Sequence, residues 1–136
     1  MTREDKELLL KDLCARLPYG VKMNHIADNE HSPKTLIGVA KDMITLEGLG
    51  GYECIDVEDY KPYLFPLSSI TIEQEKELSK LGVSYGEYAL HDDIRGLGIY
   101  VDEAYIFFEF CYKHHIDFLG LIEKDLAIDA TGLNIY

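Results

Sequence analysis

A stretch with two prolines and a clear helix start, residues 60–78 (YKPYLFPLSSITIEQEKEL), constrains the fold of this chain most strongly. A proline disfavours helical geometry in the residue before it, so Lys61 and Phe65 are expected to be extended. Thr71 and Gln74 have the spacing of a capping box, in which each side chain bonds the backbone N–H of the other residue. The sequence therefore predicts an extended segment that ends where a helix begins, directly after Thr71.

The residues before this stretch indicate one helix followed by short strands. Thr2 is a good N-cap, and apolar side chains then recur at helical spacing, with Arg16 in the last turn and Pro18 after it. Four apolar runs separated by turns follow, at residues 21–23, 35–40, 43–47 and 52–57. Consecutive strands joined by short turns favour an antiparallel sheet, and such a sheet often curls into a small SH3-like barrel.

Residues 71–136 are mainly helical in pattern. Gly82 is placed to end the first of these helices, because glycine readily adopts the left-handed conformation of a helix cap. Residues 83–101 show no clear period. Asp102 is then a good N-cap for the segment EAYIFFEFCYKHH, which is apolar almost all round and is therefore expected to be the most buried helix. Asp117 predicts a short final helix.

These patterns together predict an α+β fold in a single compact domain of 136 residues. Residues 1–70 supply an N-terminal helix and a four- to five-stranded antiparallel sheet or small SH3-like barrel, and residues 71–136 supply two to three helices. The three cysteines are far apart, the N-terminus lacks the apolar core of a signal peptide, and no apolar run reaches the length of a membrane span. We therefore expect a cytoplasmic protein with reduced thiols.

The charge of the chain is strongly negative and unevenly distributed. The net charge is −12 at pH 7, and residues 42–60 carry six acidic side chains and no basic one. Nucleic acids and anionic membranes are bound by clusters of lysine and arginine, which this chain lacks, so direct binding to either is not expected. Solubility alone explains such acidity, and the sharper interpretation is a basic partner or mimicry of the charge of a nucleic acid.

Aromatic residues follow the acidic stretch closely and predict a surface for a protein partner. The chain is then a non-enzymatic accessory or adaptor protein that binds another protein through this acidic, tyrosine-rich surface. The predicted contact residues are Glu53, Asp56, Glu58, Asp59, Tyr60 and Tyr63. A solvated sheet edge followed by aromatic residues of the core is an equally compatible interpretation.

Histidines close to acidic residues are the strongest sign of chemistry in the sequence. The alternative function is a small hydrolase or metal-dependent enzyme that uses His91 and Asp92 with His114 or His115. Neighbouring residues of a helix point about 100° apart, so the last two histidines do not readily share a metal ion. The segment GLGG at 48–51 precedes a strand rather than a helix, which disfavours a phosphate-binding loop. We therefore expect no catalytic residue, no metal site and no cofactor.

Three segments carry a resemblance to known proteins: KDLCARLPYGVKM (11–23), KPYLFPLSSITIEQ (61–74) and HHIDFLGLIEKDLAIDA (114–130). In order and spacing they resemble a group of small uncharacterised proteins of gut Bacteroidetes, their phages and their integrated elements. The segments cover about a third of the chain. The resemblance implies a cytosolic accessory protein encoded on mobile DNA, and it implies no catalytic residue.

Overall fold

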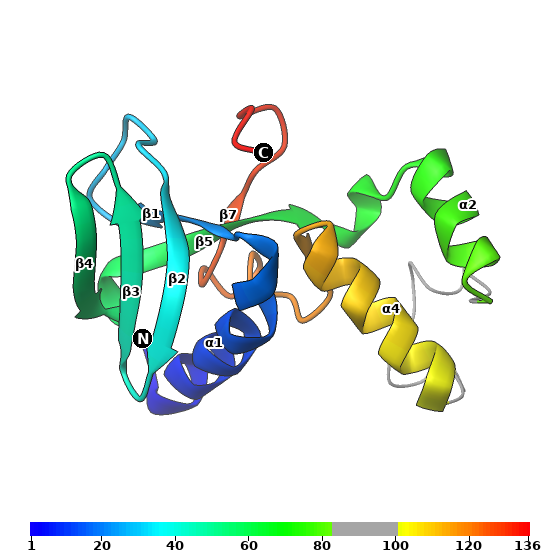
Figure 1. Ribbon diagram of the computed structural model, residues 1–136, viewed down its shortest axis with the longest axis horizontal. Coiled ribbons are helices and arrows are strands. Elements are labelled where there is room, and N and C mark those ends of the chain that lie inside the picture. The colour runs from blue at the N-terminus through cyan, green and yellow to red at the C-terminus, as the bar shows by residue number, and fades with distance from the viewer. Residues whose placement is uncertain (83–100) are drawn as a thin grey trace.

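The computed structural model of the chain describes residues 1–82 and 101–136, and these residues form an α+β fold (Figure 1). The predicted fold class is thereby confirmed. The helices are α1 (Arg3–Arg16), α2 (Ile72–Lys80) and α4 (Val101–Lys113), with short 3-10 helices η1 (Leu17–Tyr19), η2 (Val57–Asp59) and η3 (Leu67–Ser69). The strands are β1 (Lys22–His25), β2 (Lys34–Ala40), β3 (Met43–Gly48), β4 (Gly51–Asp56), β5 (Tyr60–Pro66), β6 (Ile116–Asp117) and β7 (Ile128–Asp129).

Local signals fix the ends of the helices as the sequence predicts. Thr2 and Asp5 form a capping box at the start of α1. Gly20 ends the turn after this helix in the left-handed conformation, with a φ of 67°. Thr71 and Gln74 form the second capping box, with N···O distances of 2.9 and 3.2 Å. Gly82 has a φ of 90°, as expected for a left-handed helix cap.

The described strands form one mixed sheet in the order β4-β3-β2-β1-β5-β6, with β7 also paired to β5. The first five strands of this order pair antiparallel, as predicted, whereas β6 and β7 add parallel to β5. The strands β6 and β7 contain only two residues each, which is too short for an alternating pattern of apolar and polar residues to be recognised in the sequence. Among the described strands no ladder joins β4 to β6, so the sheet is open rather than a closed barrel.

The proline-rich stretch of the sequence becomes β5, which lies inside the sheet. It pairs with β1 at residues 60–62, with β7 at residues 63–64 and with β6 at residues 65–66. Tyr60 and residues 62–64 are buried, because this strand has neighbours along its length and apolar clusters against its faces. The extended geometry expected of Lys61 and Phe65, which precede the two prolines of this stretch, is confirmed.

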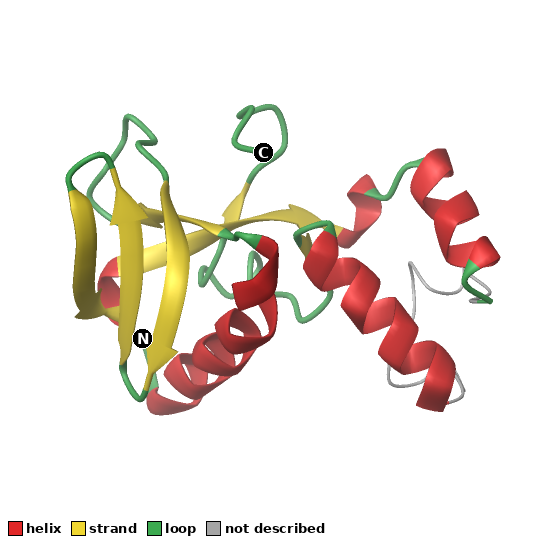
Figure 2. Ribbon diagram, viewed as in Figure 1, coloured by secondary structure: helices red, strands yellow, loops and turns green. Residues whose placement is uncertain are grey.

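Two clusters of buried apolar side chains lie side by side. The first lies between α1 and the sheet and includes Leu9, Leu13, Ile44 and Leu46. The second lies among α2, α4 and β6 and includes Leu78, Phe107, Phe110, Cys111 and Ile116. The strands gather at one end of the molecule and the two later helices at the other, with α1 against the sheet (Figure 2).

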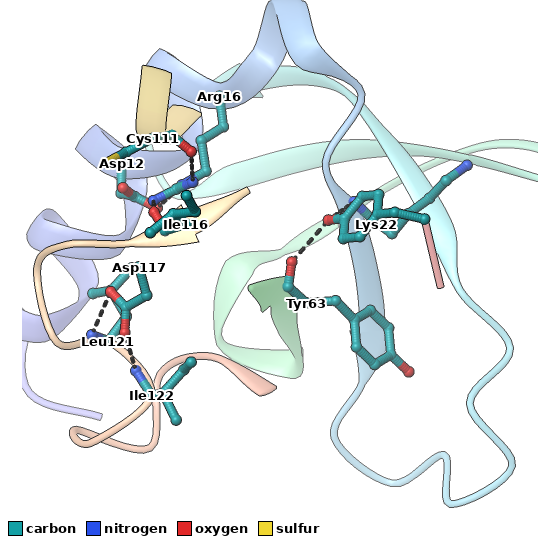
Figure 3. Close-up of polar contacts among 10 residues, drawn as sticks. Asp12, Arg16, Lys22, Tyr63, Cys111, Ile116, Asp117, Leu121 and Ile122 are labelled. Carbon is teal, nitrogen blue, oxygen red and sulfur yellow. Dashed lines mark hydrogen bonds and ion pairs between the residues drawn. The ribbon is translucent and has the colours of Figure 1, made fainter. Parts of the chain in front are cut away.

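In the C-terminal part, one predicted helix is absent from the described residues, and the last residue makes contacts that the sequence does not predict. Asp117 does not begin a helix, because the residues after it form successive turns, although its carboxylate accepts hydrogen bonds of 2.9 Å from the N–H groups of Leu121 and Ile122 (Figure 3). Tyr136 bridges two strands: its hydroxyl donates to the carbonyl of Tyr63 (2.8 Å) and accepts from the N–H of Lys22 (2.9 Å). Among the described residues, no helix could span a membrane.

Candidate partner-binding surface

The two tyrosines of the predicted partner surface lie in the core, so this part of the prediction is wrong. Tyr60 is 5% exposed and Tyr63 is 0% exposed. Tyr60 packs edge-on against the ring of His25, at 5.1 Å between ring centroids, and the Tyr63 hydroxyl lies 2.7 Å from Nδ1 of His31. Burial raises the pKa of Tyr63 to about 12. Both residues belong to an inner strand, and a partner cannot reach them.

The four acidic residues of the prediction remain at the surface, and three of them make ion pairs. Glu53 lies 2.6 Å from Nζ of Lys34, and this hydrogen bond raises the pKa of the lysine. Asp56 and Glu58 lie 3.3 and 3.6 Å from Nζ of Lys6 on α1. The ion pairs are exposed, so each contributes little to stability. Two lysines thus partly neutralise the acidic surface.

The sign of the charge around β4 remains negative after these pairs are counted. The N–H of Glu58 donates to the carboxylate of Asp56 at 2.9 Å, and this hydrogen bond is the main cause of the lowered pKa of Asp56. Asp42, Glu47 and Asp59 make no ion pair with any residue that the structure describes. The surface that includes the predicted acidic residues is therefore anionic near neutral pH.

The register of β3 and β4 separates the side chains of these strands between two faces. Ile44 and Leu46 are buried in the core, and Ile55 opposite Ile44 packs against it. The alternate residues face away from α1. We call this uncovered side of β2, β3 and β4 the outer face, and its residues are Ile37, Gly38, Met43, Thr45, Glu47, Tyr52 and Cys54.

The outer face is uncharged at its centre and exposes apolar side chains. Gly38, Thr45 and Cys54 lie opposite one another across the three strands, and the small side chains keep this row flat. Tyr52 is 71% exposed, Ile37 40% and Met43 38%. Ile37 reaches this face because a bulge shifts the register of β2 beside it. In the described parts of the chain, no helix lies over the side of β2, β3 and β4 that faces away from α1 (Figure 1).

The strand β4 also has a free edge. Within the described residues it pairs only with β3, so backbone N–H and C=O groups along its other side have no strand partner. Its pairing with β3 is regular over six residues, without a bulge. Proteins usually protect such edges with proline, lysine or a bulge. The sequence of β4, GYECID, has no proline, lysine or bulge, and its only charges are two acidic side chains, which disfavour an acidic partner strand but not a basic one.

The histidines of the alternative function point to different neighbours. Nε2 of His114 lies 3.2 Å from Glu77 on α2, whereas the ring of His115 stacks on Tyr136 with 3.7 Å between centroids. Burial lowers the pKa of His115 to about 4, so this side chain is neutral at pH 7. A cavity of about 450 Å³ lies beside both histidines.

The alternative function also requires two further residues and a place for a metal ion. His91 and Asp92 lie outside the described residues. In the described ranges, no three His, Cys, Asp or Glu side chains gather closely enough to hold a metal ion. The hydrolase or metal-enzyme function therefore stays a prediction without a described site.

The residues that sequence reasoning missed are the exposed apolar side chains of the outer face. Tyr52 lies in the middle of the acidic stretch at residues 42–60. The predicted surface instead included Tyr60 and Tyr63, which lie at the end of this stretch and just after it. Strand alternation could have found Tyr52, since it shares a face with Cys54 and not with the apolar Ile55.

Comparisons of the chain with protein-family models, with curated proteins and with solved structures found no match. The resemblance to proteins of gut Bacteroidetes and their phages therefore stays a prediction. The function of the chain must be inferred from its own surface.

Proposed function

We propose that this chain is a non-enzymatic adaptor protein that binds another protein through the outer face and the free edge of β4. The observation that carries the proposal is the combination of an uncovered apolar face with an unprotected edge strand. Exposed apolar patches and bare strand edges promote aggregation, so proteins that keep them commonly use them for binding. The acidic residues of the predicted surface flank this site, and Tyr52, on the edge strand β4, takes the place of the two buried tyrosines.

Three reactive side chains in the described ranges, those of Cys111, Asp12 and Asp117, are used by the fold itself, which supports a binding role. Cys111 is buried, and burial raises the pKa of its thiol, so the nucleophilic thiolate is scarce near neutral pH. The carboxylate of Asp12 bonds the buried Arg16 at 2.7 Å. The carboxylate of Asp117 accepts two backbone hydrogen bonds. None of these three groups faces the outer face.

The proposal predicts that the variant Tyr52→Ala loses its protein partner while the fold is kept. An exposed tyrosine ring supplies a large apolar contact area at an interface, and its removal from a surface changes stability by only about 0.5 kcal/mol. The measurement is affinity capture from a host lysate with quantitative mass spectrometry, using wild type and variant as baits in parallel.

The matched control is Tyr105→Ala. Tyr105 is 69% exposed, close to the exposure of Tyr52, but lies on α4. We expect the wild type and Tyr105→Ala to capture the same proteins and Tyr52→Ala to lose at least one of them. Equal capture by all three baits would contradict the proposed site.

A further inference from the structure

We propose that the partner supplies an extended segment carrying lysine or arginine, which pairs with β4 as a further strand of the sheet. The inference rests on the proposed function and names the chemistry and the binding mode of the partner. In this mode the backbone groups of the free edge provide affinity, and alternate side chains provide specificity. The six residues of β4 offer an edge about 20 Å long.

The shape of β4 favours an added strand over a helix or a loop. Its register with β3 runs from Gly48↔Gly51 to Met43↔Asp56 without a shift, so the free groups on its other side follow one another at regular strand spacing. Only an extended segment presents donors and acceptors at the same spacing. Tyr52 and Cys54 stand beside this edge on the outer face, where side chains of the added strand would contact them.

The charge around β4 selects a basic segment. Residues 42–60 carry six carboxylates, and the lysines that pair with them or adjoin the segment in sequence are only four: Lys6, Lys34, Lys41 and Lys61. An added strand places residues directly opposite Glu53 and Asp56, which are three positions apart in β4. Opposite charges in such cross-strand pairs are favourable. The partner segment should therefore carry basic residues three positions apart.

The same charge disfavours a second copy of this chain as the occupant. Two copies of β4 paired edge to edge would bring Glu53 and Asp56 of one copy close to the same acidic residues of the other, and like charges across strands are destabilising. Each copy also carries a net charge of −12. A basic segment of another protein does not meet this repulsion, so we propose such a segment, rather than a second copy, as the occupant of the edge.

The test is an NMR titration of the isotope-labelled full chain with the peptide TKVTKVT, whose lysines are three positions apart. We expect the amide signals of residues 51–56 to shift and their exchange with solvent to slow, with an affinity that falls as salt is added. A peptide with glutamate in place of each lysine should leave these signals unchanged, and so should a peptide with proline in place of the central threonine.

A matched pair of variants tests the role of charge. Glu53→Gln should lower the affinity for the lysine peptide by roughly two- to fivefold, the contribution of one exposed ion pair. Glu123→Gln is the same change at an exposed residue in the turns before β7, and it should leave the affinity for the lysine peptide unchanged. Equal affinities for the two variants would overturn the charge argument.

The outcomes separate this inference from the proposed function. If Tyr52→Ala loses its captured partner but the lysine peptide shifts no signal of β4, the basic-strand inference is wrong and the binding surface stands. If the signals of β4 broaden with protein concentration before peptide is added, a second copy occupies the edge, and the inference is also wrong. If shifts appear only beside the cavity of His114 and His115, strand addition fails as well.

Discussion

Arg16 shows most clearly how one side chain can organise a fold through distant partners. Its side chain is fully buried at the end of α1, where Nε donates to Asp12 at 2.7 Å (Figure 3). Its other nitrogens donate to the carbonyls of Ile116 at 2.8 Å and Cys111 at 3.4 Å. The guanidinium also lies 5.3 Å from the ring centroid of Tyr112. Arg16 therefore ties α1 to the end of α4 and to β6.

The sequence predicts the helix position of Arg16 but not its burial. A basic residue in the last turn of a helix suits the helix dipole, and this local reason suffices for an exposed side chain. The carbonyls that receive its hydrogen bonds lie 95 and 100 residues further along the chain. The prediction that Tyr60 and Tyr63 lie at the surface is wrong for the same reason. The strands that pair with β5 and bury these tyrosines come from distant segments of the chain.

The variant Arg16→Met tests whether Arg16 stabilises the fold in this way. It leaves Asp12 buried without a countercharge, and such a loss lowers the free energy of unfolding by about 3–5 kcal/mol. The double variant Asp12→Leu with Arg16→Met removes both charges and should recover most of this loss. Urea unfolding followed by circular dichroism measures all three proteins. A single variant as stable as the double variant would contradict this role of Arg16.

At the scale of elements, the parts that the sequence predicts are those with local causes. The capping box of Thr71 and the prolines of β5 act on their immediate neighbours, and the structure has both the helix start and the extended segment. The hairpin between β2 and β3 turns at Lys41 and Asp42, as its two apolar runs indicate. The parallel pairs of β5 with β6 and β7 could not be predicted, since long-range contacts alone define them.

A substitution at the cap of α2 tests this local account. Thr71→Ala removes the hydroxyl that accepts from the N–H of Gln74, and the loss of an N-cap costs about 1 kcal/mol of stability. Thr71→Ser keeps the hydroxyl and serves as the control. In chemical unfolding, the wild type and the serine variant should have similar midpoints, and the alanine variant should have a lower one. Identical midpoints for the serine and alanine variants would show that the cap does not hold the helix start.

At the scale of the whole molecule, the proposed binding site and the later helices occupy opposite ends. β4 lies at one end of the sheet, while α2 and α4 lie at the other end of the molecule (Figure 1). Between them stand β5 and the hydrogen bonds of Arg16, which connect the two apolar clusters. The acidity of residues 42–60 is visible in the sequence, but only the sheet order reveals that β4 has a free edge.

Hydrogen–deuterium exchange of the full chain, with and without the protein captured by the wild-type bait, tests the binding surface most directly. We expect the captured protein to slow exchange at the amides of β4, with no change in α2, and Tyr52→Ala to abolish this protection. Protection confined to α2, α4 or the cavity beside His114 and His115, with β4 exchanging as in the free chain, would contradict the proposed function.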